Sequence, residues 1–126
     1  MLHIQRPDGL PQANGYSHVT IANGTVYVSG QVPVSADGVV AEGVEAQVEQ
    51  VFANLEAALR AAGTAWDRVA KLTYYLTDIA DLPVVRAVRD RHIDLERPPA
   101  SSLVQIAALV DPRFVVEVDA IATIDG

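Results

Sequence analysis

Residues 97–124 read RPPASSLVQIAALVDPRFVVEVDAIATI, and this stretch decides the fold. Pro98-Pro99 ends any preceding helix, because a residue that precedes proline is pushed out of the helical region. Two runs rich in β-forming residues follow at 102–109 and 114–122, and they predict two strands. The second run alternates, so that one face carries Phe114, Val116, Val118 and Ala120, and the other face carries Val115, Glu117, Asp119 and Ile121.

The composition predicts a single globular domain spanning residues 1–126. Half of the residues are hydrophobic and 20% are charged, which is typical of a chain that folds around a core. The net charge of −7 argues against nucleic-acid binding, and the absence of cysteine excludes disulfides and thiolate chemistry. We see no signal peptide and no membrane-spanning run, and therefore expect a cytoplasmic protein without membrane contact.

Hydrophobic periodicity and turn residues predict the elements before residue 97. In order, these are a short strand at 2–5, a strand at 18–22, an Asn23-Gly24 hairpin turn, a return strand at 25–29, a helix at 44–62, a strand at 69–77 and a helix at 82–95. The helix at 44–62 is the clearest, because apolar residues recur every three or four positions and Gly63 suits its end. In the strand at 69–77 we expect Ala70, Leu72, Tyr74 and Leu76 to share one face.

The main elements thus follow the order ββαβαββ, which predicts an α+β fold with one mixed sheet and both helices on one face. Several strands carry apolar residues on both faces. The sheet face without helices therefore needs a cover, and we expect other subunits of a homo-oligomer to provide it.

Few residues suggest chemistry by themselves. The histidines, His3, His18 and His92, fall on a terminal segment, a strand start and a helix without the spacing of metal ligands. Tyr16 lies in a loop of small and polar residues, and Ser29-Gly30-Gln31 ends a strand where glycine permits close approach of a ligand. A packed surface aromatic and a simple strand-to-loop turn are the structural alternatives.

The carboxylates of the last strand also allow two interpretations. Glu117 and Asp119 share a face and ordinarily would face water, but a carboxylate in a cleft between subunits can hold a water molecule as a general base. We expect a site at the small residues 100–102, which directly follow the prolines. The arginines of the second helix and its exit, Arg86, Arg89, Arg91 and Arg97, are interpreted as a solvated helix face, with a phosphate site as the alternative.

Together these stretches resemble the RidA family, also called YjgF or L-PSP, over nearly the whole chain. Residues 15–18 (GYSH) resemble the family's GPYSH loop without its proline, and residues 27–33 (YVSGQVP) resemble its VSGQ.P segment. Residues 69–78 are similar to VVK.TVYLTD, and residues 99–122 are similar to PAxS followed by VEIEA.A. The helix with Gln47, Asn54 and Leu55 is similar to the family's Q…NL pattern.

The resemblance implies a chorismate-mutase-like α+β fold that packs as a trimeric barrel, with ligand sites in clefts between subunits. It implies hydrolysis of reactive enamines and imines, such as 2-aminoacrylate, to a keto acid and ammonia without a metal or organic cofactor. In such members an arginine directly after the PA dipeptide clamps the substrate carboxylate, and an acid on the last strand positions the attacking water.

This sequence departs from that pattern at one position, where Ser101 stands in place of the arginine. A serine hydroxyl offers one neutral hydrogen bond instead of a charged fork, so activity on 2-aminoacrylate is in doubt. Arg113 or an arginine of a neighbouring subunit is a possible replacement. The resemblance implies Glu117 as the catalytic acid and, as substrate-binding residues, Tyr16, Ser29, Gly30, Gln31 and Ser101.

Two other functions compete with an imine or enamine deaminase. The first is a non-catalytic module of the same fold that binds or senses a small metabolite. The second is the ribonuclease or translation-inhibitor role with which some of the family are labelled, and the acidic balance of this chain argues against it.

Overall fold

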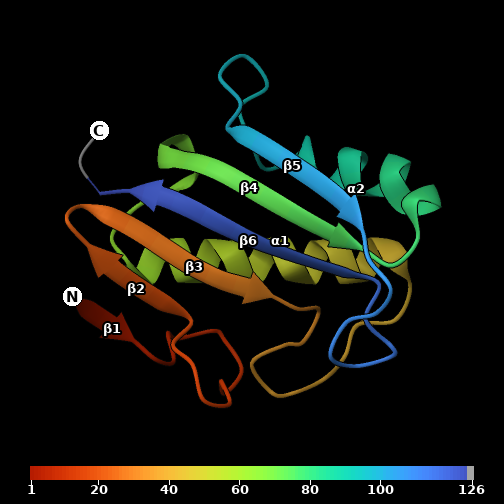
Figure 1. The fold of residues 1–126 in the computed structure, drawn as a ribbon, viewed down its shortest axis with the longest axis horizontal. Helices are drawn as coiled ribbons and strands as arrows, with labels where there is room; N and C mark the ends of the chain where they lie inside the picture. Colours follow the sequence, from red (N-terminus) through yellow and green to blue (C-terminus); the bar gives the residue numbers. More distant parts are fainter. Residues whose placement is uncertain (125–126) are drawn as a thin grey trace.

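The computed structural model describes residues 1–124, which form one six-stranded sheet with two helices. The strands are β1 (Leu2–Ile4), β2 (Val19–Ala22), β3 (Thr25–Gln31), β4 (Val69–Leu76), β5 (Ala100–Gln105) and β6 (Val116–Thr123). The helices are α1 (Val44–Ala61) and α2 (Leu82–Arg89). The order along the chain is the expected ββαβαββ with the short β1 added, and both helices cover the same face (Figure 1).

The last strand lies in the middle of the sheet, whose order is β1-β2-β3-β6-β4-β5. β6 pairs antiparallel with β3 on one side and with β4 on the other. Its predicted alternation is confirmed, because Val116, Val118 and Ala120 are at most 1% exposed. The second half of the stretch at 97–124 therefore forms a central strand of the sheet and contributes one row of the core, whereas its first half forms the edge strand β5.

The hairpin signal at Asn23-Gly24 is also confirmed. Asn23 and Gly24 have φ angles of 51° and 74°, which a two-residue type I′ turn requires. Ala22 pairs with Thr25 across the turn. β5, by contrast, runs parallel to β4, and α2 makes the crossover between them.

Three details of the predicted elements are wrong. α2 ends at Arg89 instead of residue 95, and His92 lies in the turn that follows it. β5 covers 100–105 instead of 102–109, because its parallel partner β4 ends at Leu76, opposite Gln105. An irregularity near the start of β4 leaves Ala70 exposed and buries Val69 in its place.

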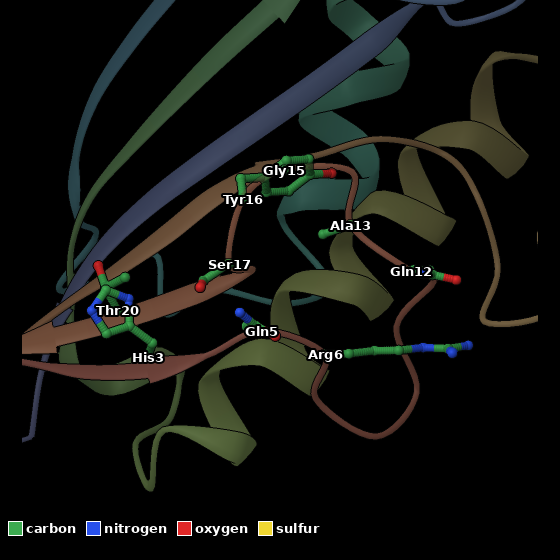
Figure 2. A pocket seen from close by; sticks show the side chains of 9 residues that line it. All are labelled: His3, Gln5, Arg6, Gln12, Ala13, Gly15, Tyr16, Ser17 and Thr20. Carbon is green, nitrogen blue, oxygen red and sulfur yellow. The ribbon is translucent and has the colours of Figure 1, made fainter.

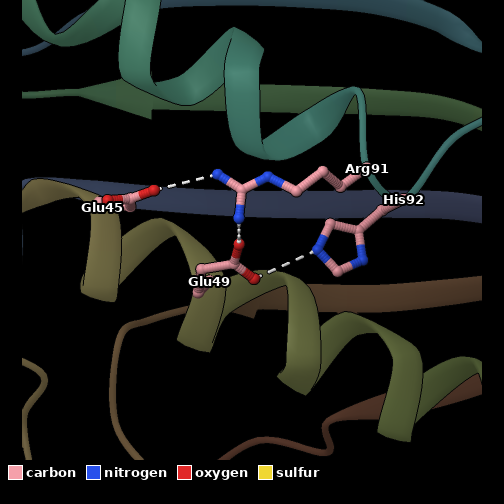
Figure 3. A network of polar contacts seen from close by, with 4 residues as sticks. All are labelled: Glu45, Glu49, Arg91 and His92. Atoms are coloured by element: carbon pink, nitrogen blue, oxygen red, sulfur yellow. Dashed lines mark hydrogen bonds and ion pairs between the residues drawn. The ribbon is translucent and has the colours of Figure 1, made fainter.

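Charged residues connect the two helical segments at their surface. Arg91, just after α2, pairs with Glu45 and Glu49 of α1, and His92 Nε2 lies 3.3 Å from Glu49 (Figure 3). The His92 ring also stacks on Phe52 of the core, with ring centroids 5.0 Å apart. Exposed ion pairs contribute little to stability individually, so the stacked ring is the more important contact here.

Two buried amides of α1 fix the backbone next to the candidate site. Asn54 donates to the carbonyls of Val32 and Val34, directly after β3. Gln47 donates to the Arg113 carbonyl and accepts from the Val115 amide, directly before β6. Buried amides with satisfied partners specify one arrangement of the chain. They therefore set the relative position of the ends of β3 and β6.

Candidate functional site

Gly30 of β3 leaves room for the Glu117 side chain of β6, which lies on the sheet face without helices. A Cβ atom added to Gly30 would lie 2.3 Å from Glu117 Oε2 and 2.7 Å from its Cδ. The φ angle of Gly30 is not positive, so glycine is required here for space and not for backbone conformation. The β3–β6 register shifts between Val28 and Gln31, which places Gly30 in an irregular part of the strand.

The environment of Glu117 favours its protonated form. Burial raises the pKa of Glu117, and the nearby Asp119 carboxylate raises it further. No side chain within residues 1–124 donates a hydrogen bond to the Glu117 carboxylate. A half-buried carboxylate with a raised pKa and no hydrogen-bonding side chain is a stronger base than an ordinary glutamate and can take a proton from a bound water molecule.

Asp119, unlike Glu117, is held by a neighbouring side chain. The Tyr75 hydroxyl donates to Asp119 Oδ2 at 3.0 Å, and this hydrogen bond raises the pKa of Tyr75. Tyr75 lies opposite Glu117 in the register of β4 and β6. The structure thus gives the two acids of the strand different surroundings.

Ser29 connects β3 to the loop that carries Tyr16. The Ser29 hydroxyl donates to the Ser17 carbonyl at 2.7 Å, and its amide donates to the His18 carbonyl at 2.9 Å. The Tyr16 side chain is 47% exposed and packs edge-on against the His18 ring. Ser29 therefore holds the loop in place, while the Tyr16 ring remains accessible to a ligand.

Gln31 is placed behind this cluster. Its side chain is 1% exposed and donates to His18 Nδ1 and to the Ser29 carbonyl. His18 Nε2 in turn lies 2.7 Å from the Pro11 carbonyl, so the hydrogen-bond partners of the ring place a proton on Nε2. The geometry gives Gln31 a positioning role instead of a ligand contact. Sequence reasoning gave His18 no role in the site, although His18 ends the GYSH stretch at 15–18.

An open hollow of about 740 Å³ lies beside the Tyr16 loop. His3 and Thr20 lie together at one end of it, and Arg6 and Gln12 lie toward the other (Figure 2). The lining residues are mostly polar, and Glu117 is not one of them. The Glu117 carboxylate therefore lies outside this hollow.

Ser101 lies on the opposite side of the sheet from Glu117. In the parallel ladder Ser101 pairs with Leu72, whose side chain is 1% exposed and faces the helices. Neighbours in a ladder point to the same face, so Ser101 also faces the helix side, and it lines a hollow with Arg86 and Arg89. A single copy of the chain thus cannot bring Ser101 and Glu117 to one small ligand.

Arg113 is already paired within the chain. Its Nε and Nη2 donate to Asp111 at 3.1 and 2.8 Å, a two-pronged ion pair. Arg113 lowers the pKa of Asp111 to about 2 through this hydrogen bonding. The guanidinium fork is occupied by this carboxylate, which argues against Arg113 as the replacement for the missing arginine.

Neither a metal-binding cluster nor a membrane-spanning helix is found in the part of the chain that the structure describes. Residues 1–124 contain no group of three or more histidines and acids placed to hold a metal ion. Within the same residues, neither helix is long and apolar enough to cross a membrane.

Comparison with known proteins agrees with this geometry. The family described as endoribonuclease L-PSP matches residues 6–124. A RutC family protein of Synechocystis is 36% identical over 96% of this chain and 95% of its own. The chloroplastic Reactive Intermediate Deaminase A of Arabidopsis thaliana is 35% identical over 90% of this chain and 62% of its own.

The fold is that of a solved relative over its whole length. The crystal structure of RidA from an Antarctic Psychrobacter species superimposes with a TM-score of 0.91 and 37% identity, covering 98% of this chain and 99% of that one. The chain therefore has the RidA-like α+β fold and belongs to the endoribonuclease L-PSP family, the family of RidA.

Proposed function

We propose that this protein hydrolyses a small reactive imine, or an enamine after its tautomerisation, to a carbonyl compound and ammonia without a cofactor. The observation that carries the proposal is Glu117, a half-buried carboxylate of raised pKa packed over Gly30. The name of the Arabidopsis relative, a reactive intermediate deaminase, supports the same class of reaction.

The carboxylate of Glu117 performs both proton transfers. In the first step it takes a proton from water while the water oxygen bonds to the imine carbon, and it passes that proton to the imine nitrogen. In the second step it moves the proton of the new hydroxyl group to the nitrogen, the carbon–nitrogen bond breaks, and ammonia leaves. One imine and one water thus give one carbonyl compound and one ammonia.

The site is completed by a second copy of the chain. Ser101 and Glu117 face opposite sides of one sheet, so a ligand that meets both must lie between copies. The sheet face of Glu117 carries no helix, and Tyr27 and Val104 on it are 48% and 46% exposed. Burial of these side chains favours a homo-oligomer, and the resemblance to RidA favours a homotrimer with three such clefts. Tyr16, Ser29 and Gly30 then belong to one subunit and Ser101 to the next.

A metabolite-binding module without turnover is the second candidate, and the serine at position 101 is the observation that favours it. It would show stabilisation by ligand without product release. The ribonuclease activity in the family's description has weaker support here, because the net charge is −7 and the basic residues form no stripe.

The test is turnover by a matched pair of variants. Imines derived from several amino acids, anionic and neutral, are generated in situ, and ammonia and carbonyl product are followed. Glu117→Gln is expected to abolish turnover, whereas Glu42→Gln, an exposed acid before α1, retains it. Wild-type protein inactive on the whole panel, or full activity of Glu117→Gln, would contradict the proposal.

A further inference from the structure

The hollow beside Ser101 lies between α2 and the helix-side face of β4 and β5. Its volume is about 300 Å³. α2 contributes residues at spacings of three and four, which form one face of a helix: Leu82, Val85, Arg86 and Arg89. The strands contribute Tyr74, Ser101 and Leu103. The hollow thus has apolar walls and a small set of polar groups, which is the usual make-up of a small-molecule site.

The two guanidinium groups of the hollow differ in their partners. Arg89 donates through Nε and Nη2 to one oxygen of Asp90, at 3.0 and 2.8 Å. Arg86 has no hydrogen bond or ion pair to any side chain within the described residues 1–124. A guanidinium without a protein partner, at the edge of a hollow in an acidic protein, is available to an anionic ligand.

The remaining polar groups add donors without adding negative charge. Burial raises the pKa of Tyr74 to about 12, so its hydroxyl stays protonated near neutral pH and does not repel an anion. The Ser101 hydroxyl is a further neutral donor, and a second hollow of about 310 Å³ shares Tyr74, Arg89 and Ser101 with the first. The hollow thus holds guanidinium groups, a tyrosine hydroxyl and a serine hydroxyl as donors, and its apolar walls suit a short aliphatic chain.

We propose that Arg86 supplies the guanidinium that position 101 lacks, and that this hollow binds the carboxylate of a small 2-oxo or 2-imino acid. The inference rests on the proposed function in taking that carboxylate as part of the substrate. It also accounts for the serine, because an arginine at position 101 would place a third guanidinium beside Arg86 and Arg89. Like charges in one hollow repel each other, so the positive charge for the ligand is carried by α2 and position 101 of β5 is neutral.

Binding of a charged ligand and its neutral analogue tests the assignment. The oligomer is titrated calorimetrically with 2-oxobutyrate and with 2-oxobutanamide. Arg86→Gln is expected to weaken 2-oxobutyrate binding about tenfold or more, since hydrogen bonds to charged groups contribute about 1.5–3 kcal/mol. It should leave binding of the amide unchanged, and Arg60→Gln on α1 should change neither.

Arg86 is exposed, so Arg86→Gln is expected to fold, and its melting temperature checks this. The double variant Arg86→Gln with Ser101→Arg should recover binding of 2-oxobutyrate, because a guanidinium other than the Asp90-bound Arg89 again faces the hollow. Unchanged affinity in Arg86→Gln, equal binding of acid and amide by the wild type, or no binding of 2-oxobutyrate by the wild type would each overturn the assignment.

Glu117→Gln separates this inference from the proposed function. It should retain binding of 2-oxobutyrate while losing turnover. Binding that depends on Arg86 in a protein without imine turnover would refute the hydrolase and keep the anion site. Turnover that depends on Glu117, with a KM that Arg86→Gln does not change, would refute the anion site and keep the hydrolase.

Discussion

Substitution of Gly30 by alanine tests the geometry at Glu117 most directly. The added Cβ would lie 2.3 Å from Oε2, 2.7 Å from Cδ and 3.1 Å from Cγ of Glu117. All three atoms must move, so rotation of the terminal carboxylate alone is not enough. Because the φ angle of Gly30 is not positive, alanine is tolerated by the backbone, and the clash is the only perturbation.

The expected loss follows from the size of that displacement. An ordinary carbon–oxygen contact is more than 3 Å, so the carboxylate must shift by about 1 Å, and such a shift of a catalytic group costs about a hundredfold in rate. Overpacking of this kind also lowers the free energy of unfolding by about 1–3 kcal/mol. Displacement toward solvent should return the pKa of Glu117 toward its ordinary value.

Three measurements check Gly30→Ala: kcat, urea unfolding and NMR titration of the Glu117 carboxyl carbon. The matched control is Glu117→Asp, whose side chain is one methylene shorter. In the double variant Gly30→Ala with Glu117→Asp the clash is relieved, so the two effects on stability should not add. An unchanged kcat together with an unchanged Glu117 titration in Gly30→Ala would refute the reasoning.

Other predictions concern acid–base behaviour, the buried amide and the open sheet face. Burial raises the pKa of Glu117, so the contribution of this group to stability is complete below its unfolded-state pKa and is lost as pH rises through its folded-state pKa. Urea unfolding across that pH range should show the loss of stability. Glu117→Gln should abolish this pH dependence. Asp119→Asn removes the second cause of the shift and should lower the pKa that limits activity on the acid side. Gln31→Ala leaves His18 Nδ1 without its donor and should lower the free energy of unfolding by about 1–3 kcal/mol, measured in urea. Tyr27→Asp on the open face should dissociate the oligomer in sedimentation experiments, whereas an unchanged sedimentation coefficient would show that this face is not the interface.

Local pattern predicted the fold because the decisive signals lie within single elements. The alternation of β6 places Glu117 on the face opposite Val116 and Val118, and the Asn23-Gly24 turn fixes the β2–β3 register. The errors are at ends of elements. The end of β5 depends on the length of its partner β4, which periodicity within residues 102–109 cannot reveal.

The candidate site was predictable only in part, for a similar reason. Sequence similarity placed Gly30 and Glu117 in matching motifs, and the structure brings them into contact. It did not show that Ser101 faces the other side of the sheet, because that depends on the parallel register of β5 with β4. Gln31 looked equivalent to Gly30 in the same motif, yet its side chain is buried against His18.

The arginines after residue 85 show how a single class of residue can have several roles. We interpreted them as a solvated helix face, and Arg91 and Arg97 do form exposed ion pairs with acids. Arg86 and Arg89 lie instead on the face of α2 that borders Ser101. This contact joins α2 to β5, the next strand along the chain, and Arg86 lies in none of the stretches that resemble the family. Comparison of motifs shows that position 101 lacks the family's arginine. Only the packing of α2 on β5 shows that Arg86 lies beside this position.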